Sequence, residues 1–190
     1  MITRVRQGLV FGRFQPFHKG HLSYVRIGYG LSEELYVGIV TPPHKYLVEG
    51  EDGIEYRWSP EENPFTYNER HQMIKRSLQQ AEDINMKRVN LVPFPLRDIR
   101  LWRYYLPGDI VAFIRDSPAF EVGGVDRLRE GGVKTMVIDD SLEEVIRGKH
   151  VREAIINDNG WEDMVPRGVA DYIREINGVD RLRKLVGKKA

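Results

Sequence analysis

The sequence predicts an α/β protein with a parallel, doubly wound, Rossmann-like sheet of about five strands and with helices at its C-terminus. Apolar runs of strand length alternate along the chain with segments of helical spacing. The strand-like runs are almost continuously apolar, as expected for strands covered by helices on both faces. A length of 190 residues suits one domain over 1–190, with about 160–190 as a helical extension packed on it.

Each element follows from a local pattern. Thr66 precedes Glu69 by three residues, which is the pattern of a capping box, so we expect a helix from there to about Ala81. The segment 41–63 carries three prolines and many charges and is expected to be a long loop. The predicted strands are 8–14, 34–40, 88–94, 109–115 and 134–139, and the other predicted helices are 21–31, 123–130, 149–157 and 166–186.

The composition excludes several classes of protein. The 29 basic and 28 acidic residues give a net charge of +1, so no nucleic-acid partner is expected. The chain has no cysteine, which rules out disulfides and thiolate chemistry. Its N-terminus is polar, and no apolar stretch is long enough to cross a bilayer. We therefore expect a cytoplasmic protein without a membrane partner.

The stretch from Gly12 to His21, Gly-Arg-Phe-Gln-Pro-Phe-His-Lys-Gly-His, concentrates the chemistry of the chain. It leaves a predicted strand and enters a predicted helix, where backbone N–H groups hold phosphates. His18 and His21 share one face of that helix, and Gly20 lets a ligand approach the backbone. From spacing alone, phosphate binding competes with two other interpretations: a metal pair, which lacks an obvious third ligand, and ordinary surface histidines.

This stretch resembles the His-x-Gly-His motif of the nucleotidyltransferase superfamily, and it is especially similar to archaeal nicotinamide mononucleotide adenylyltransferases. The similarity continues in order through most of the chain, in Asn63–Arg70, Pro95–Ile99, Gly148–Arg152, Trp161–Pro166 and Ile176–Leu185.

The resemblance implies an in-line attack of an acceptor phosphate on the α-phosphorus of ATP, without a covalent intermediate and with pyrophosphate as leaving group. With nicotinamide mononucleotide as acceptor, the product is NAD. The resemblance further implies Mg²⁺ bridging the phosphates without a dedicated protein site, and a homo-oligomer. It assigns catalysis to His18, His21 and Arg152, acceptor binding to Trp102, and ATP binding to Gly12, Arg13, Phe14, Lys19, Gly20, Asp116, Ser117, Gly148 and Lys149.

The chain departs from this family in the second phosphate segment. Arg147 and Lys149 stand where hydroxyl residues are expected, and neither is a good N-cap. The segment is then a more cationic phosphate cradle, a site adapted to another acceptor or to CTP, a nucleotide-binding regulator without turnover, or a solvated basic helix. Enzymes with such a site would be pantetheine-phosphate adenylyltransferases, which use another acceptor, or cytidylyltransferases, which use CTP.

Three further features leave alternatives open. Asp116 adds a carboxylate after the fourth strand, where it either bonds the nucleotide or caps the next helix. Trp102 either stacks on the nicotinamide ring or is a core aromatic residue. His44 and Lys45 open the 41–63 loop, which is either a lid over the triphosphate or a surface insertion.

Overall fold

A computed structural model describes residues 4–43, 58–115, 124–138 and 146–187. The chain forms two compact units. Unit 1 comprises Met1–Gly12, Ser23–Pro43 and Asp83–Glu143, and unit 2 comprises Arg13–Leu22, His44–Glu82 and Glu144–Ala190. The prediction of one domain over the whole chain stays a prediction.

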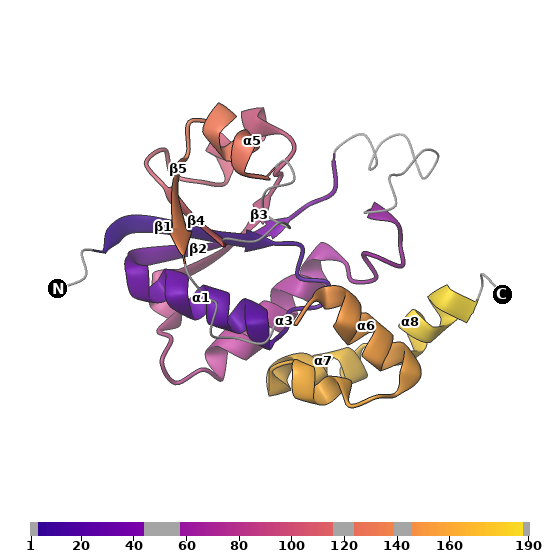
Figure 1. The fold of residues 1–190 in the computed structure, drawn as a ribbon. Helices are drawn as coiled ribbons and strands as arrows, with labels where there is room; N and C mark the ends of the chain where they lie inside the picture. The colour runs from indigo at the N-terminus through magenta and orange to yellow at the C-terminus, as the bar shows by residue number, and fades with distance from the viewer. Residues whose placement is uncertain (1–3, 44–57, 116–123, 139–145, 188–190) are drawn as a thin grey trace. The chain divides into compact units, whose positions relative to one another are not determined.

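Unit 1 contains the sheet, whose five strands run in the order β3-β2-β1-β4-β5 and pair in parallel throughout (Figure 1). The predicted parallel five-stranded sheet is therefore confirmed. The strands are β1 (Val5–Gly12), β2 (Ser32–Val40), β3 (Val89–Phe94), β4 (Val111–Arg115) and β5 (Lys134–Ile138).

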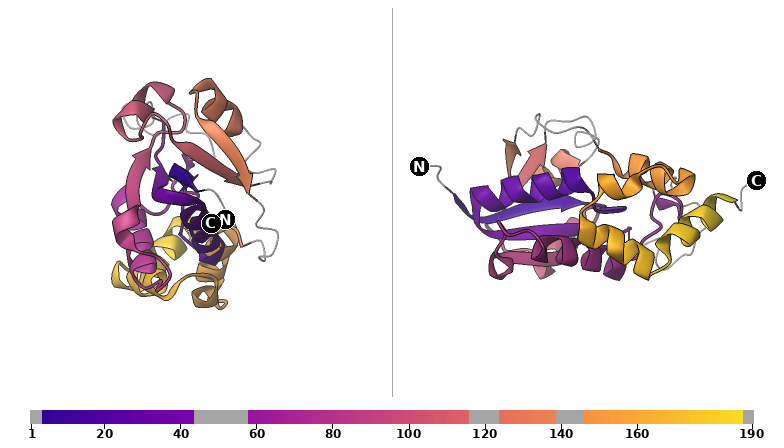
Figure 2. Two further views of the ribbon diagram at one scale, coloured as in Figure 1. Left: turned by 90° about the vertical axis from the view of Figure 1, so that its left-hand side faces the viewer. Right: turned by 90° about the horizontal axis from the view of Figure 1, so that it is seen from below.

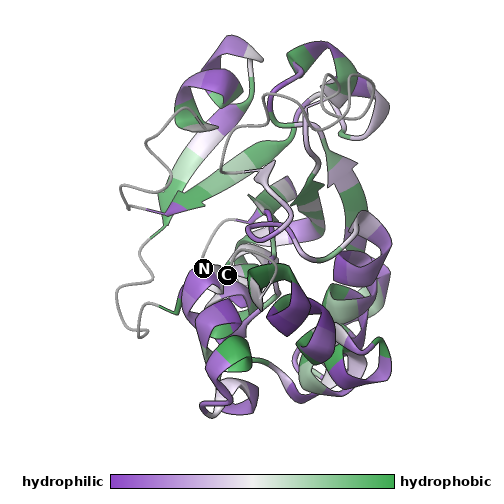
Figure 3. Ribbon diagram, turned by 90° about the vertical axis from the view of Figure 1, so that its right-hand side faces the viewer, coloured by the Kyte–Doolittle hydropathy of each residue, from purple (hydrophilic) through white to green (hydrophobic). Residues whose placement is uncertain are grey.

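The strands are held by apolar burial, and Figure 3 draws most of the sheet in green. Leu9, Val37 and Phe113 are fully buried. Burial of each side chain stabilises the folded state by about 1.5–3 kcal/mol relative to leaving it exposed. Helix α1 (Lys19–Leu31) packs closely on β1, because a Cβ at Gly28 would lie 2.6 Å from Val10 Cγ1. The Tyr24 hydroxyl donates to the Phe113 carbonyl over 2.5 Å.

The order of strands places a topological switch point between β1 and β4, the inner strands from which the connections run in opposite directions. Right-handed crossovers through α1 and through α5 (Gly124–Glu130) then require the two helices to lie on opposite faces of the sheet, as Figure 1 shows. Ligands of doubly wound sheets bind beyond the carboxyl ends of the strands at such a point. The segment from Arg13 to His21 continues directly from the carboxyl end of β1.

Unit 2 is built from helices, of which α6, α7 and α8 lie together in Figure 2. Arg76 of α3 pairs with Glu175 of α7 through two bonds of 2.5 and 3.1 Å. The capping box at the start of α3 is confirmed: Thr66 Oγ1 accepts from the Glu69 N–H and Glu69 Oε2 accepts from the Thr66 N–H. The elements are α3 (Tyr67–Gln79), α6 (Gly148–Asn157), the 3₁₀ turn η4 (Trp161–Met164), α7 (Arg167–Glu175) and α8 (Gly178–Gly187).

Two sequence predictions need correction, and two short turns were not predicted. The predicted helix 166–186 is two helices, because Asn177 adopts a left-handed φ of 52° and breaks it before Gly178. The first strand ends at Gly12 instead of residue 14, since Phe14 also has a left-handed φ, of 53°. Two 3₁₀ turns next to β3, η2 (Met86–Arg88) and η3 (Ile99–Tyr104), were not predicted.

Across the described ranges, no helix combines the length and the apolar character required to cross a membrane.

The capping box generates a prediction about stability. We expect Thr66→Ala to lower the free energy of unfolding by about 1 kcal/mol, because the N3 backbone N–H loses its acceptor. Thr66→Ser keeps the hydroxyl and should stay close to the wild type. Urea unfolding measures both variants, and equal stability of Thr66→Ala and Thr66→Ser would contradict the role of the cap.

Candidate functional site

The turn that follows β1 is held in an uncommon backbone conformation. Phe14 has a φ of 53°, which costs energy for a residue with a bulky side chain. Its ring is 1% exposed and packs 5.6 Å from the Phe17 ring and edge-on, at 4.8 Å, against the His21 ring. This aromatic packing fixes the turn and supports the histidine next to it.

His18 and His21 form a reciprocal pair at the start of α1. His18 Nδ1 accepts from the His21 N–H and His21 Nδ1 accepts from the His18 N–H, each over 3.3 Å. The arrangement is that of a capping box in which imidazoles replace Thr and Glu. The rings stack with centroids 3.5 Å apart. Since both Nδ1 atoms accept, Nε2 carries the hydrogen of each neutral ring. Each histidine thereby has a donor suited to a phosphate oxygen, at the positive end of a helix.

Gln15 joins three segments of unit 2. Its buried side-chain amide pairs with the backbone of Phe65: Nε2 donates to the Phe65 carbonyl over 2.8 Å and Oε1 accepts from the Phe65 N–H over 3.0 Å. Its main-chain carbonyl accepts from Arg152 Nη1 over 2.9 Å. Three segments therefore meet at Gln15: the turn Arg13–His21 (the histidine turn), the segment before α3, and the helix α6. We call this meeting point the junction.

The first turn of α6 approaches the histidine turn very closely. A Cβ at Gly148 would lie 2.9 Å from the Gln15 carbonyl oxygen, so only glycine fits this position without a shift of the backbone. The N-cap is Arg147, whose side chain makes no capping hydrogen bond in the described part of the structure. This agrees with the expectation that the replacement of a hydroxyl residue by arginine removes the cap.

Three arginines and one carboxylate surround the junction. Arg152 is 5% exposed, and its Nη2 lies 2.6 Å from Glu62 Oε1. Arg13 Nη2 lies 3.7 Å from Glu62 Oε2. Arg70 is 3% exposed and donates to the Arg13 carbonyl over 2.7 Å. Burial lowers the pKa of the Arg70 guanidinium to about 10, so Arg70 remains charged at neutral pH. The cluster is cationic and suits a polyanion.

The structure brings most of the predicted phosphate-binding residues into unit 2, whereas the predicted roles themselves remain predictions. Lys19 and Lys149 are exposed, and Lys149 Nζ lies 3.7 Å from Glu153 Oε1 on the same helix. Gly12 ends β1 in unit 1. Asp116, Ser117 and the loop residues His44 and Lys45 lie outside the described residues. Those in unit 2 are Arg13, Phe14, His18, Lys19, Gly20, His21, Gly148, Lys149 and Arg152.

Trp102 belongs to unit 1, where it occupies the core position that the sequence left open. It is 5% exposed, packs with its ring centroid 5.3 Å from that of Phe94, and donates from its indole N–H to the Pro95 carbonyl over 2.9 Å. A Cβ at Gly131 would lie 2.3 Å from the indole ring. This packing favours a structural role, and the predicted stacking on an acceptor ring stays a prediction.

Gln15, Glu62 and Arg70 were missed by the reasoning from sequence. Gln15 lies between Phe14 and His18, which were assigned roles, and Arg70 ends the motif Asn63–Arg70, in which no residue was assigned one. Their near-complete burial, which decides their importance, is invisible in a motif. Glu62 lies in the segment 41–63, whose charges give no local signal for an individual carboxylate.

A metal site built by the protein is not found among the described residues, since no group of three or more His, Cys, Asp or Glu side chains is placed to hold an ion there. The donors of the junction are N–H groups of histidine and arginine, which bind phosphate oxygens and not a hard cation. Such a donor set fits a divalent ion carried by the phosphates of a nucleotide.

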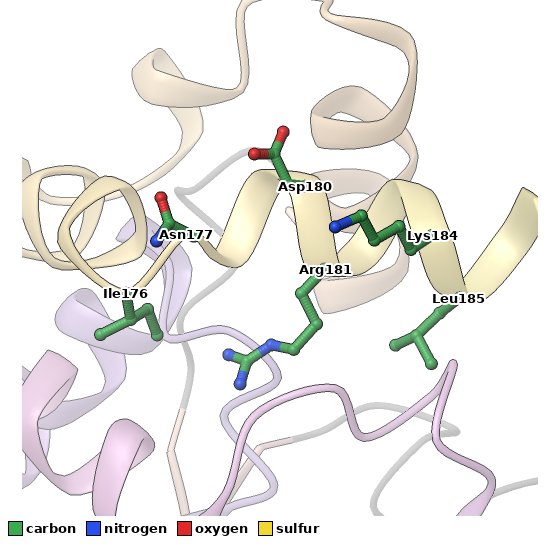
Figure 4. A pocket seen from close by; sticks show the side chains of 6 residues that line it. All are labelled: Ile176, Asn177, Asp180, Arg181, Lys184 and Leu185. Atoms are coloured by element: carbon green, nitrogen blue, oxygen red, sulfur yellow. The ribbon is translucent and has the colours of Figure 1, made fainter.

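A separate pocket of about 620 Å³ lies along α8 in unit 2 (Figure 4). Arg181 reaches from α8 toward it, and its Nη1 donates to Glu69 Oε1 over 2.8 Å. Burial raises the pKa of the Glu69 carboxyl, but the bonds from Arg181 and Thr66 outweigh burial and lower it. The lining residues are Ile176, Asn177, Asp180, Arg181, Lys184 and Leu185, and the predicted site residues are not among them.

A doubly wound parallel sheet, followed directly by paired histidines at a helix N-terminus, defines a nucleotidyltransferase. The chain belongs to the cytidylyltransferase-like family, whose model matches residues 9–157.

Two curated relatives illustrate the range of the family. A phosphonoformate cytidylyltransferase of Streptomyces viridochromogenes is 32% identical over 93% of this chain and 95% of its own length. A nicotinamide-nucleotide adenylyltransferase of Thermococcus kodakarensis is 31% identical over 95% of this chain and 89% of its own length.

The fold also matches a solved structure. A bifunctional NMN adenylyltransferase/ADP ribose pyrophosphatase of Francisella tularensis, crystallised with AMP and a manganese ion, superposes with a TM-score of 0.65 at 20% identity. The match covers 97% of this chain and 53% of that one, so the chain spans about half of the bifunctional protein.

The close approach at Gly148 generates a prediction. Gly148→Ala places a methyl group against the Gln15 carbonyl and should lower the free energy of unfolding by about 1–3 kcal/mol. Gly108→Ala is the matched control, since a Cβ at Gly108 meets nothing within 4 Å. Thermal and urea unfolding of both variants provide the comparison. Equal stability of the two variants would show that α6 does not approach Gln15 as described.

Proposed function

We propose that the protein transfers an adenylyl group from ATP to nicotinamide mononucleotide, with NAD and pyrophosphate as products. The observation that carries the proposal is the buried junction in unit 2, where Arg152 bonds the Gln15 carbonyl three residues before the reciprocal pair His18 and His21. The support from comparison is the 31% identity to a nicotinamide-nucleotide adenylyltransferase over nearly the whole chain.

In this proposal an oxygen of the acceptor phosphate attacks the α-phosphorus, and the bond from that phosphorus to the oxygen bridging to the β-phosphate breaks. Pyrophosphate leaves with the electron pair, and no protein atom is bonded covalently on the way. The chemistry depends on position and on the stabilisation of charge that develops on phosphate oxygens.

The residues of unit 2 have distinct proposed roles. His18 and His21 donate from Nε2 to phosphate oxygens at the start of α1, where the helix dipole favours negative charge. Arg13 and Arg152 neutralise the triphosphate. Gly20 lets a phosphate approach the backbone, whereas Gly148 lets α6 approach the Gln15 carbonyl that Arg152 bonds. Gly12, Phe14, Lys19, Lys149, Asp116 and Ser117 are proposed to bind ATP as the family resemblance implies, and Trp102 to contact the acceptor.

A divalent cation, which we propose to be Mg²⁺, would supply positive charge that reduces the mutual repulsion of the phosphate oxygens. The residues described here would hold the phosphates and not the ion.

A second candidate is cytidylyl transfer from CTP to a phosphonate or phosphate acceptor. The observation in its favour is the 32% identity to a phosphonoformate cytidylyltransferase over 95% of that protein. The family model is itself cytidylyltransferase-like. Both candidates use the same histidine pair and differ in the base and in the acceptor.

One panel of reactions separates the candidates. Purified protein with Mg²⁺ receives ATP or CTP, together with nicotinamide mononucleotide or phosphonoformate, and pyrophosphate release is measured. We expect release with ATP and nicotinamide mononucleotide. Release with CTP and phosphonoformate alone would replace the first candidate by the second, and binding of nucleotide without release from any pair would favour a regulator.

The histidine pair generates a quantitative prediction. His21→Ala should lower kcat by about 10²–10³-fold, which corresponds to about 2.7–4 kcal/mol of lost transition-state stabilisation. The matched control is His71→Ala, because His71 is a half-buried histidine of α3 in the same unit, outside the junction. An unchanged kcat in His21→Ala would remove His21 from the catalytic residues.

A further inference from the structure

Glu62 places a carboxylate at the centre of the cationic junction. Its Oε1 lies 2.6 Å from Arg152 Nη2, and its Oε2 lies 3.7 Å from Arg13 Nη2. Its side chain is 14% exposed, whereas that of Arg152 is 7% exposed. One acid thus connects an arginine of the histidine turn with an arginine of α6, the two segments assigned to triphosphate binding.

The carboxylate is held in this position by its backbone. The Glu62 N–H donates to the Ser59 carbonyl over 3.1 Å, and the Asn63 N–H donates to the same carbonyl over 2.9 Å. A little further along, the backbone of Phe65 is paired with the Gln15 side chain. The turn therefore presents Glu62 to the arginines from a segment that is anchored on the histidine turn itself.

A carboxylate and a phosphate compete for the same donors on a guanidinium. Both are bound by charge-assisted N–H···O bonds of similar length and geometry. Nη1 of Arg152 bonds the Gln15 carbonyl and Nη2 bonds Glu62. A triphosphate that binds Nη2 of Arg152 and Nη2 of Arg13 must therefore share these donors with Glu62 or replace it. Sharing is unfavourable, because two anions a few ångströms apart repel strongly in a partly buried site.

We propose that Glu62 determines the affinity of the site for nucleoside triphosphate, because its carboxylate occupies the position of a phosphate between Arg13 and Arg152 and is exchanged for one on binding. This inference rests on the proposed function for the identity of the ligand. Exchange keeps the buried Arg152 guanidinium and the half-buried Arg13 guanidinium paired in each state, so neither state has an uncompensated charge on Arg152. The free energy of binding gained from each phosphate contact is smaller, because the contact with Glu62 is lost at the same time.

The alternative role for Glu62 is purely positioning, in which its carboxylate orients Arg152 while the nucleotide is bound. The two roles predict opposite effects of removing the charge. Exchange predicts tighter binding, since the phosphate no longer competes with an internal anion. Positioning predicts weaker binding or a lower kcat, since Arg152 loses its orientation.

The test is Glu62→Gln, which preserves size and removes the charge. Isothermal titration with inorganic tripolyphosphate and with ATP measures the affinity of the wild type and the variant. We expect the variant to bind both about tenfold more tightly. Glu69→Gln is the matched control, because Glu69 pairs over 2.8 Å with Arg181 of the same unit instead of with Arg13 or Arg152. The affinity of the Glu69→Gln variant for both ligands should equal that of the wild type.

Equal or weaker binding of tripolyphosphate by Glu62→Gln overturns the inference, as does equal tightening in Glu69→Gln. If Glu62→Gln does not fold, Glu62→Asp replaces it, because the shorter side chain withdraws the carboxylate from the arginines by one methylene. We expect a smaller gain in affinity from Glu62→Asp, and no gain overturns the inference. Tighter tripolyphosphate binding without pyrophosphate release from any substrate pair supports the inference while contradicting the proposed function. Pyrophosphate release from ATP and nicotinamide mononucleotide, without a gain in tripolyphosphate affinity, supports the proposed function and contradicts the inference.

Discussion

The hydrogen bonds of Gln15 are the constraint on which the candidate site depends. A single buried residue satisfies the backbone of Phe65 with its side chain and the guanidinium of Arg152 with its carbonyl. Leaving any of these groups unpaired in a buried place would cost about 1–3 kcal/mol. The histidine turn, the segment before α3 and the helix α6 are consequently fixed to one another within unit 2, although they come from distant parts of the chain.

This constraint explains why the groups proposed to bind phosphate form one cluster. The reciprocal bonds between His18 and His21 fix the tautomer of each ring, so that Nε2 carries the hydrogen. Arg152 is buried at the same junction, and Glu62 balances its charge. A site arranged in this way needs little rearrangement to stabilise charge on a phosphate, which is the main requirement of nucleotidyl transfer.

The sequence predicts the structure well where the determining information is local or periodic. The capping box of Thr66 and Glu69 spans four residues, and the apolar runs of the strands carry their own burial pattern. The break at Asn177 was also readable, since an Asn-Gly pair is a common turn, but the helical periodicity on both sides concealed it. The pairing of Gln15 with Phe65 spans 50 residues and that with Arg152 spans 137, and no local pattern encodes such contacts. Trp102 is a different case, because the sequence leaves stacking on a ligand and packing in the core both open. Its burial and its bond to Pro95 favour packing, and the contact with the acceptor stays a prediction.

We propose that the histidine turn and α6 bind one triphosphate together. A crystal structure with a non-hydrolysable ATP analogue, in which a methylene group replaces the oxygen between the α- and β-phosphates, tests it most directly. We expect phosphate oxygens within hydrogen-bonding distance of His21 Nε2 and of the Arg152 guanidinium in the same molecule, with the Glu62 carboxylate no longer on Arg152. A triphosphate bound away from either residue would contradict it.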